Sequence, residues 1–261
     1  MTATEAVYVY GVVPSGTPPD VFASVAGIAP PSGVAMVETD GAAAIVSRVP
    51  LADFGTVALE ANLKKPDWLE QKVQAHNDVL AAALAATTVL PFRFGTIYTD
   101  EQQVRAMLAE RMELADTLSR LRGTVEYGVK VLLDGEALRT RRAQSQPSDP
   151  GGGSGAEYLR RKQQEKQLDA EVRAFATSCA EESHEHLAAA SQDARANPAQ
   201  HPAVAGGQML LNGAYLVSAE QEKEFRSALQ DLRERFGDDG VSYELTGPWP
   251  PYNFVDEEGV P

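Results

Sequence analysis

Residues 125–133 read Val-Glu-Tyr-Gly-Val-Lys-Val-Leu-Leu, and this alternating stretch decides how the chain is divided. Apolar side chains recur at every second position from Val125 to Leu133, which predicts a strand with one buried face. The helical pattern that precedes the stretch ends at Gly123. We therefore expect a first domain over residues 1–122 and a second domain that begins at 123.

The second domain is predicted to alternate strands with helices. A helix is expected from about 157 to about 195, then a strand over 208–217, a helix opened by a capping box of Ser218 with Gln221, and a strand over 241–245. This order is most of a ferredoxin-like βαββαβ unit. Residues 135–156 are rich in Ser, Pro and Gly, so they are predicted to form an inserted flexible loop.

The first domain is predicted to be a mixed α+β domain. Its continuous apolar run at 6–13 is typical of a strand covered on both faces, and the Asp40-Gly41 step predicts a hairpin between 34–38 and 42–48. A long amphipathic helix is expected from Pro66 onward.

A second helix of the first domain is predicted to open with a capping box of Thr99 and Gln102. The fold class is thus α+β with two domains, 1–122 and a ferredoxin-like 123–247. The remaining residues, 248–261, are expected to form a tail that packs on the N-terminal domain.

Charge and cysteine content restrict the function. The 261 residues include 23 Lys+Arg and 37 Asp+Glu, which gives a formal net charge of −14. Such a chain repels nucleic acid, which is bound mainly through cations, so no nucleic-acid partner is expected. A single cysteine, Cys179, cannot form an intramolecular disulfide. We expect a cytoplasmic protein with no secretory signal and no membrane span.

Catalytic and metal-binding patterns are weak in this sequence. Gly151–Gly155 follows a polar stretch rather than a strand, so it is interpreted as linker and not as a phosphate loop. His184 and His186 diverge on a helix, Cys179 falls on an apolar stripe, and His76 is interpreted as a packing residue. We predict no catalytic residue, no metal, no cofactor and no enzymatic activity.

Two segments stand out as candidates for structural or partner-binding roles. Pro91-Phe-Arg-Phe-Gly95 places an arginine between two phenylalanines, and Gly247–Val255 is an extended, proline-rich segment with three aromatic residues. The candidate site residues are Pro91, Phe92, Arg93, Phe94, Gly95, Trp249, Tyr252 and Phe254.

The same segments carry a family resemblance. Taken together, five motifs in order along the chain resemble the gas vesicle accessory protein F/L family: His76–Leu80, Val89–Tyr98, Val125–Val131, Tyr158–Lys162 and Leu245–Phe254. The resemblance implies a two-domain α+β protein of the prokaryotic cytoplasm that helps to assemble gas vesicles, the gas-filled compartments that provide buoyancy. It brings no catalytic residues with it.

The resulting hypothesis is a non-enzymatic gas vesicle assembly factor that binds the hydrophobic major shell protein and other accessory proteins. An apolar subunit aggregates in water, and an acidic partner would keep it assembly-competent. The alternative hypothesis is a small-molecule-binding regulatory protein built on a ferredoxin-like sheet, since a fold does not fix a function.

Overall fold

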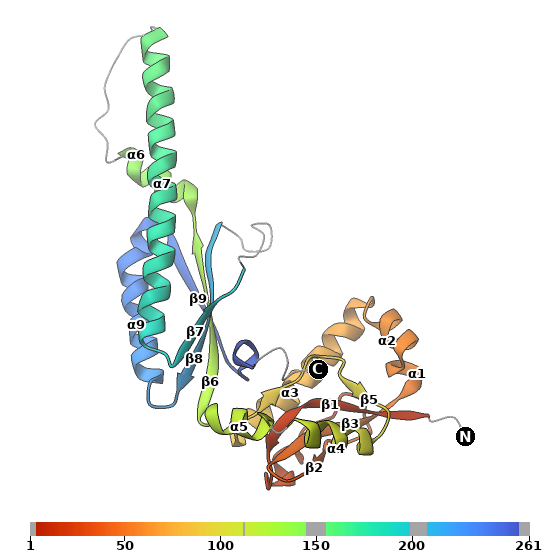
Figure 1. Ribbon diagram of the computed structural model, residues 1–261. Helices are drawn as coiled ribbons and strands as arrows, with labels where there is room; N and C mark the ends of the chain where they lie inside the picture. Colours follow the sequence, from red (N-terminus) through yellow and green to blue (C-terminus); the bar gives the residue numbers. More distant parts are fainter. Residues whose placement is uncertain (1–3, 112, 145–154, 199–207, 256–261) are drawn as a thin grey trace. The chain divides into compact units, whose positions relative to one another are not determined.

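The computed structural model describes residues 4–111, 113–144, 155–198 and 208–255. They form two compact units, each with its own β-sheet (Figure 1). The N-terminal unit comprises the described residues up to Val125 and the segment from Pro248 onward; the C-terminal unit comprises Glu126–Gly247. The predicted mixed α+β class is confirmed.

The sheet of the N-terminal unit is built around β1 (Glu5–Pro14). The strand order is β2-β3-β1-β4, and β5 also pairs with β1. The further strands are β2 (Ala35–Glu38), β3 (Ala42–Pro50), β4 (Leu90–Pro91) and β5 (Ile97–Tyr98). The central place of β1 and the β2–β3 hairpin confirm two predictions, and Gly41 has the positive φ, +90°, that the hairpin turn requires.

Helices surround this sheet. In chain order they are η1 (Pro19–Phe22), α1 (Leu51–Phe54), α2 (Thr56–Asn62), α3 (Pro66–Ala86), α4 (Glu101–Glu110), α5 (Glu113–Arg120) and η3 (Tyr252–Phe254). The predicted helix from Pro66 is confirmed as α3, whose Val79, Leu80 and Ala83 enter the core beside Tyr8 and Tyr10.

The capping box predicted at Thr99 and Gln102 is wrong by one position. Asp100 is the N-cap of α4, because its Oδ1 accepts a hydrogen bond from the Gln103 backbone N–H over 2.9 Å. The Gln103 side chain in turn accepts from the Thr99 backbone N–H over 3.2 Å. A carboxylate at the N-cap also interacts favourably with the helix dipole.

The C-terminal unit has a four-stranded sheet in the order β7-β8-β6-β9. Its elements are β6 (Thr124–Leu133), α6 (Gly135–Gln144), α7 (Gly155–Ala189), β7 (Asp193–Ala196), β8 (Gln208–Ser218), α9 (Glu222–Phe236), η2 (Gly237–Asp239) and β9 (Val241–Trp249). Helices α7 and α9 lie side by side on one face of this sheet (Figure 1). The strands predicted near 125, 208 and 241 are confirmed.

Two predicted spans of this unit, the inserted loop and the long helix, are corrected. Residues 135–144 form helix α6 instead of loop, because Asp134 Oδ1 accepts from the backbone N–H groups of Glu136 and Ala137, both over 3.0 Å, and Leu138 is fully buried. Residues 145–154 of the predicted loop lie outside the described residues. The long helix ends at Ala189 rather than near 195, and β7 follows, paired antiparallel with β8.

The capping box of Ser218 with Gln221 is also corrected. Gln221 is the N-cap of α9 and makes no side-chain cap hydrogen bond, although its backbone N–H donates to Ser218 Oγ over 3.3 Å. No helix in the described part of the chain is long and apolar enough to cross a bilayer.

Candidate functional site

The candidate segment Pro91–Gly95 joins β4 to β5 along one edge of the N-terminal sheet. Phe92 is fully buried, and its backbone N–H donates to the Tyr10 carbonyl over 2.8 Å. Arg93 is exposed and Phe94 is half-buried. Gly95 has φ +91°, a conformation that L side chains rarely adopt, so glycine is required at this turn.

The Tyr8 hydroxyl connects this segment to the core. Tyr8 Oη shares a hydrogen bond of 2.8 Å with His76 Nδ1 and accepts a second one, of 3.2 Å, from the Gly95 backbone N–H. The Phe94 ring lies 5.8 Å from the His76 ring, centroid to centroid. His76 is 2% exposed, and its Nε2 has no hydrogen-bond partner among the described residues. Burial lowers the pKa of His76 to about 4 and raises that of Tyr8, so both side chains are neutral at pH 7.

The proline-rich segment at the end of the described chain is partly anchored and partly exposed. Phe254 is 1% exposed, and its carbonyl accepts a hydrogen bond of 3.4 Å from Arg120 Nη2. Trp249 and Tyr252 remain 45% and 41% exposed. After burial and Tyr10, Tyr252 is a further group that raises the pKa of Tyr8. The structure thus brings Tyr252 and Gly95 into the surroundings of the same hydroxyl.

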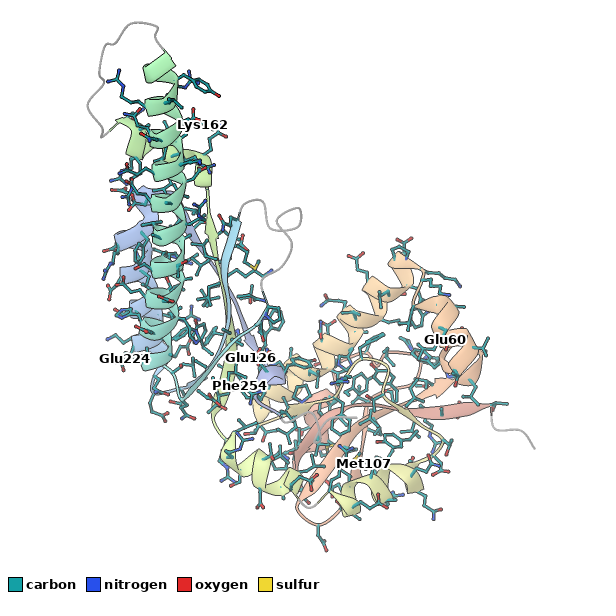
Figure 2. All side chains as sticks on the ribbon, turned by 45° about the horizontal axis from the view of Figure 1, so that its top comes forward. Glu60, Met107, Glu126, Lys162, Glu224 and Phe254 are labelled. Atoms are coloured by element: carbon teal, nitrogen blue, oxygen red, sulfur yellow. The ribbon has the colours of Figure 1, made fainter. Side chains whose placement is uncertain are left out.

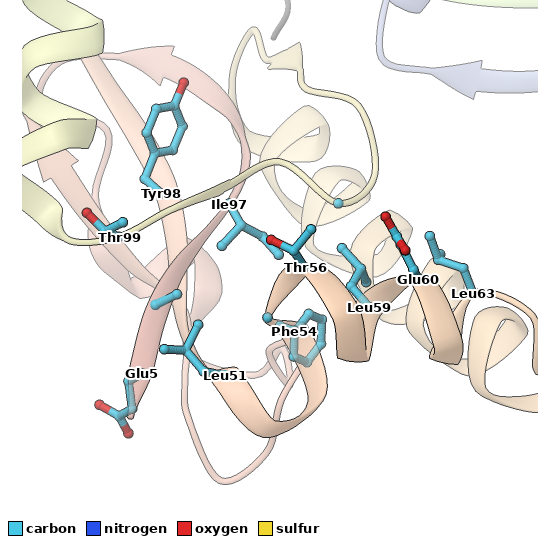
Figure 3. Close-up of a pocket in the computed structure, with 13 residues that line it drawn as sticks. Glu5, Leu51, Phe54, Thr56, Leu59, Glu60, Leu63, Ile97, Tyr98 and Thr99 are labelled. Atoms are coloured by element: carbon cyan, nitrogen blue, oxygen red, sulfur yellow. The ribbon is translucent and has the colours of Figure 1, made fainter. Parts of the chain in front are cut away.

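An open groove of about 400 Å³ lies beside Gly95 in the N-terminal unit (Figure 3). One wall is formed by α1 and α2, and the other by residues 95–99 with the start of β1. Its apolar lining includes Ala6, Leu51, Phe54, Leu59, Leu63 and Ile97, and its polar lining includes Glu5, Thr56, Glu60 and Thr99. We call this feature the α2–β5 groove.

Helical spacing produces the α2 wall. Thr56, Leu59, Glu60 and Leu63 recur at intervals of three and four residues, so they share one face of the helix and stand in a row in Figure 3. Leu59 approaches Gly95 closely: a Cβ built at Gly95 would lie 3.9 Å from Leu59 Cδ2. Glu60, labelled in Figure 2, is exposed. No element was predicted for residues 51–63, because a helix of seven residues gives too short a periodic signal.

The histidine and cysteine residues considered in the sequence for metal binding or catalysis lie outside the groove lining. Among the residues that the structure describes, no group of three or more His, Cys, Asp or Glu side chains could hold a metal ion. Cys179 is 1% exposed, as predicted for a core residue, and burial raises the pKa of its thiol. His184 Nδ1 is hydrogen-bonded to Tyr215 Oη over 3.0 Å. Cys179, His184 and His76 all serve packing in this structure.

Comparison with known proteins gives a consistent picture. The family model described as gas vesicle synthesis protein GvpL/GvpF matches residues 6–256. Gas vesicle protein L of Streptomyces sp. (strain CB03234) is 32% identical over 226 residues, which cover 83% of this chain and 82% of that protein. Gas vesicle protein F1 of Halobacterium salinarum is 27% identical over 257 residues, which cover 97% of this chain and 94% of that protein.

Two crystal structures share the fold. Gas vesicle protein GvpF from Anabaena sp. PCC7120 superposes with a TM-score of 0.70 at 18% identity, with 97% of each chain covered. The corresponding protein from Microcystis aeruginosa gives a TM-score of 0.67 at 20% identity, with 96% of this chain and 99% of that chain covered. The α+β architecture described above is therefore shared over nearly the whole chain.

Proposed function

The chain belongs to the gas vesicle synthesis protein GvpL/GvpF family, and we propose that it is a non-enzymatic assembly factor that binds the hydrophobic major shell protein of gas vesicles. Family membership supports an accessory role in gas vesicle formation. Direct binding of the shell protein, contacts with other accessory proteins and a location in the prokaryotic cytoplasm or on the vesicle are parts of the proposal.

The observation that carries this proposal is an apolar groove on a strongly acidic chain. Leu59, Leu63 and Ile97 offer apolar surface in an open groove, whereas the net charge of the whole chain is −14. Apolar contacts would hold an aggregation-prone subunit, since burying apolar surface is the main driving force of association. The net charge would keep the resulting complexes apart in solution.

The candidate residues receive different roles in this proposal. Phe92 and Phe254 are buried, so we assign them to the support of the N-terminal unit. Gly95 forms part of the groove wall. Trp249 and Tyr252 are exposed aromatic side chains, which are frequent at the centre of protein interfaces, so we assign them to partner contacts.

We also propose that residues 123–247 form a ferredoxin-like domain. The C-terminal unit runs β6, α6 and α7, β7, β8, α9, β9, and its sheet order β7-β8-β6-β9 supports this assignment. The N-terminal domain would then cover 1–122, with the segment from 248 packed on it; the compact units, which divide after Val125 and after Gly247, support this proposal.

Co-purification tests the proposed function. The tagged chain is co-expressed with the major shell protein of its own gene cluster, and the amount of shell protein that co-elutes after a moderate salt wash is measured. We expect the wild type to retain the shell protein and Leu59→Asp to lose at least about tenfold, since a charge would have to enter an apolar contact.

Val57→Asp is the matched control. Val57 lies on the same helix and is 82% exposed outside the groove lining, so the added charge stays in water. Equal losses for the two variants would show that α2 itself, rather than the groove, is what matters. A folded wild-type chain that retains no shell protein would refute shell binding. Neither the comparisons nor the described residues favour the alternative of a small-molecule-binding regulator.

A further inference from the structure

The outer edge of β5 faces the α2–β5 groove. In the register of β1 and β5, Val7 is opposite Tyr98 and Tyr8 is opposite Ile97, and the Val9 backbone N–H donates to the Thr96 carbonyl over 2.9 Å. Successive residues of a strand direct their backbone groups to opposite sides. The Thr96 carbonyl and the backbone groups of Tyr98 therefore face β1, and the N–H and C=O of Ile97 point away from it.

The residues that line the groove are consistent with the outward direction of the Ile97 backbone N–H and C=O. Ile97, Tyr98 and Thr99 line the groove in succession, although the Ile97 side chain points toward α2 and the Tyr98 side chain points away from it (Figure 3). A cavity that touches consecutive strand residues follows the backbone edge rather than one face of the sheet. Among the described residues, β5 pairs with β1 alone.

β4, on the same edge of the sheet, is different. The Phe92 backbone N–H donates to Tyr10, so Phe92 faces β1 and the preceding residue, Pro91, occupies an outward position. Proline has no N–H to donate, and proteins use it to prevent strand addition at exposed edges. The edge is therefore closed at Pro91 and open at Ile97.

The acidic residues of the groove indicate what kind of partner segment it would bind. Glu5 and Glu60 are exposed and lie at opposite ends of the groove in Figure 3. Arg48 Nη1 is 3.9 Å from Glu5 Oε2, and both side chains are more than half exposed. Between these carboxylates lie Leu51, Phe54 and Leu59 (Figure 3). An apolar segment with a basic residue at its end complements this arrangement.

We propose that the α2–β5 groove binds an extended apolar segment of a partner, which pairs with Ile97 as an added strand and places a Lys or Arg against Glu60. The added strand would gain main-chain hydrogen bonds from β5 and apolar contacts from α2, as in other cases of strand addition. Only the identity of the partner as the shell protein rests on the proposed function.

Ile97→Pro tests the pairing in the full chain. The substitution removes the outward N–H, as Pro91 does at its own position, whereas Ile97→Ala removes the side chain and keeps the N–H. We expect Ile97→Pro to reduce co-eluting shell protein about tenfold, and Ile97→Ala to reduce it less. Glu60→Lys is also expected to reduce it, and Val57→Ala is not. Retention of shell protein by folded Ile97→Pro at the wild-type level would overturn the pairing.

A second measurement does not depend on the shell protein. A short synthetic peptide of alternating Val and Thr with a terminal Lys is added to the wild-type chain, and hydrogen exchange of the Ile97 amide is followed by NMR. We expect slower exchange with this peptide and unchanged exchange with the same peptide N-methylated along its pairing edge. Unchanged exchange with both peptides overturns strand addition. Slower exchange in a chain that retains no shell protein would refute the proposed function and leave the strand-addition site standing.

Discussion

Each unit of the molecule holds a tyrosine–histidine pair against its sheet, and the two pairs differ in what surrounds them. In the N-terminal unit, His76 is 2% exposed, stacks on the Tyr10 ring at 5.6 Å between centroids, and bonds to Tyr8. In the C-terminal unit, His184 is half-buried on α7 and bonds to Tyr215 of β8. The first pair is fully buried, whereas His184 of the second pair is partly exposed to solvent.

The two tyrosines also differ in the groups that they contact beyond their histidines. Tyr8 also accepts a hydrogen bond from the Gly95 backbone, so the N-terminal pair connects the core to the wall of the α2–β5 groove. Tyr215 packs on Phe225 at 5.4 Å between ring centroids, so the C-terminal pair ties helices to their own sheet. We infer that changes near Tyr8 affect the groove as well as stability, whereas changes near Tyr215 affect stability alone.

The largest expected effect comes from Phe92→Ala compared with Phe225→Ala. Both side chains are fully buried, and each truncation is expected to cost about 3–5 kcal/mol of unfolding free energy. Trp68 lies on α3 of the N-terminal unit, whereas Trp249 is the last residue of β9 in the C-terminal sheet. Denaturant unfolding followed by tryptophan fluorescence in a Trp249→Phe background therefore reports the N-terminal unit. Only Phe92→Ala should shift the fluorescence transition. Equal shifts for both variants would mean that the units unfold together, and the comparison would lose its basis.

The next effect is a pH dependence that belongs to the N-terminal pair. Burial lowers the pKa of His76 from its ordinary 6.5 to about 4, so the folded state resists protonation. Between these two pH values the unfolded state binds a proton at His76 and the folded state does not. The free energy of unfolding is therefore fully retained above pH 6.5 and decreases as the pH falls toward 4. The loss should reach about 2 kcal/mol at pH 5.

Unfolding free energies at pH 7 and pH 5, followed by tryptophan fluorescence, measure this loss. His76→Gln should flatten the profile, because glutamine does not titrate in this range. His184→Gln leaves His76 in place and should keep the wild-type loss. A wild-type profile in His76→Gln would show that another group carries the pH dependence.

A smaller effect is expected from alanine at two glycines with positive φ. Gly95 has φ +91° and Gly123 has φ +71°, and an L residue in this region costs about 1–2 kcal/mol. Stability should therefore fall similarly in Gly95→Ala and Gly123→Ala. Only Gly95→Ala should also reduce retention of the shell protein, because Gly95 lines the groove and Gly123 does not contribute to its lining. Unaltered retention in Gly95→Ala would separate the Tyr8 hydrogen bond from the groove.

The sequence predicted the elements that carry their own periodicity. β1, the β2–β3 hairpin, α3 and β8 have repeating apolar positions and clear turn residues, and all four are confirmed. β7 was missed because Asp193-Ala-Arg-Ala has no strand pattern and is held in place by pairing with β8. α6 was missed because its composition resembles a linker, while its cap and buried Leu138 depend on the folded unit.

The candidate site was predictable only in part. The unusual composition of Pro91–Gly95 identified a segment that lies at the edge of the sheet, and the positive φ of Gly95 explains why glycine is needed there. The opposite wall was not predicted, because α2 is seven residues long and too short for a periodic signal. A groove between segments some forty residues apart is a tertiary feature, so its volume and its acidic ends follow from the fold alone.

The smallest effect is expected in the C-terminal unit, at the ion pair that joins α6 to α7. Arg139 Nη2 lies 2.7 Å from Asp169 Oδ1, but the two side chains are 51% and 45% exposed. Water screens such pairs, so Arg139→Ala should cost less than about 1 kcal/mol. Far-UV circular dichroism during denaturation measures it, because α7 supplies 35 helical residues to that signal. Leu138→Ala is the contrasting change on the same helix, since Leu138 is fully buried and its truncation should cost about 2–5 kcal/mol. If the two variants lose equal stability, α6 is held by charge rather than by packing, and the C-terminal unit would depend on its ion pairs in a way that the dry core around Tyr8 does not.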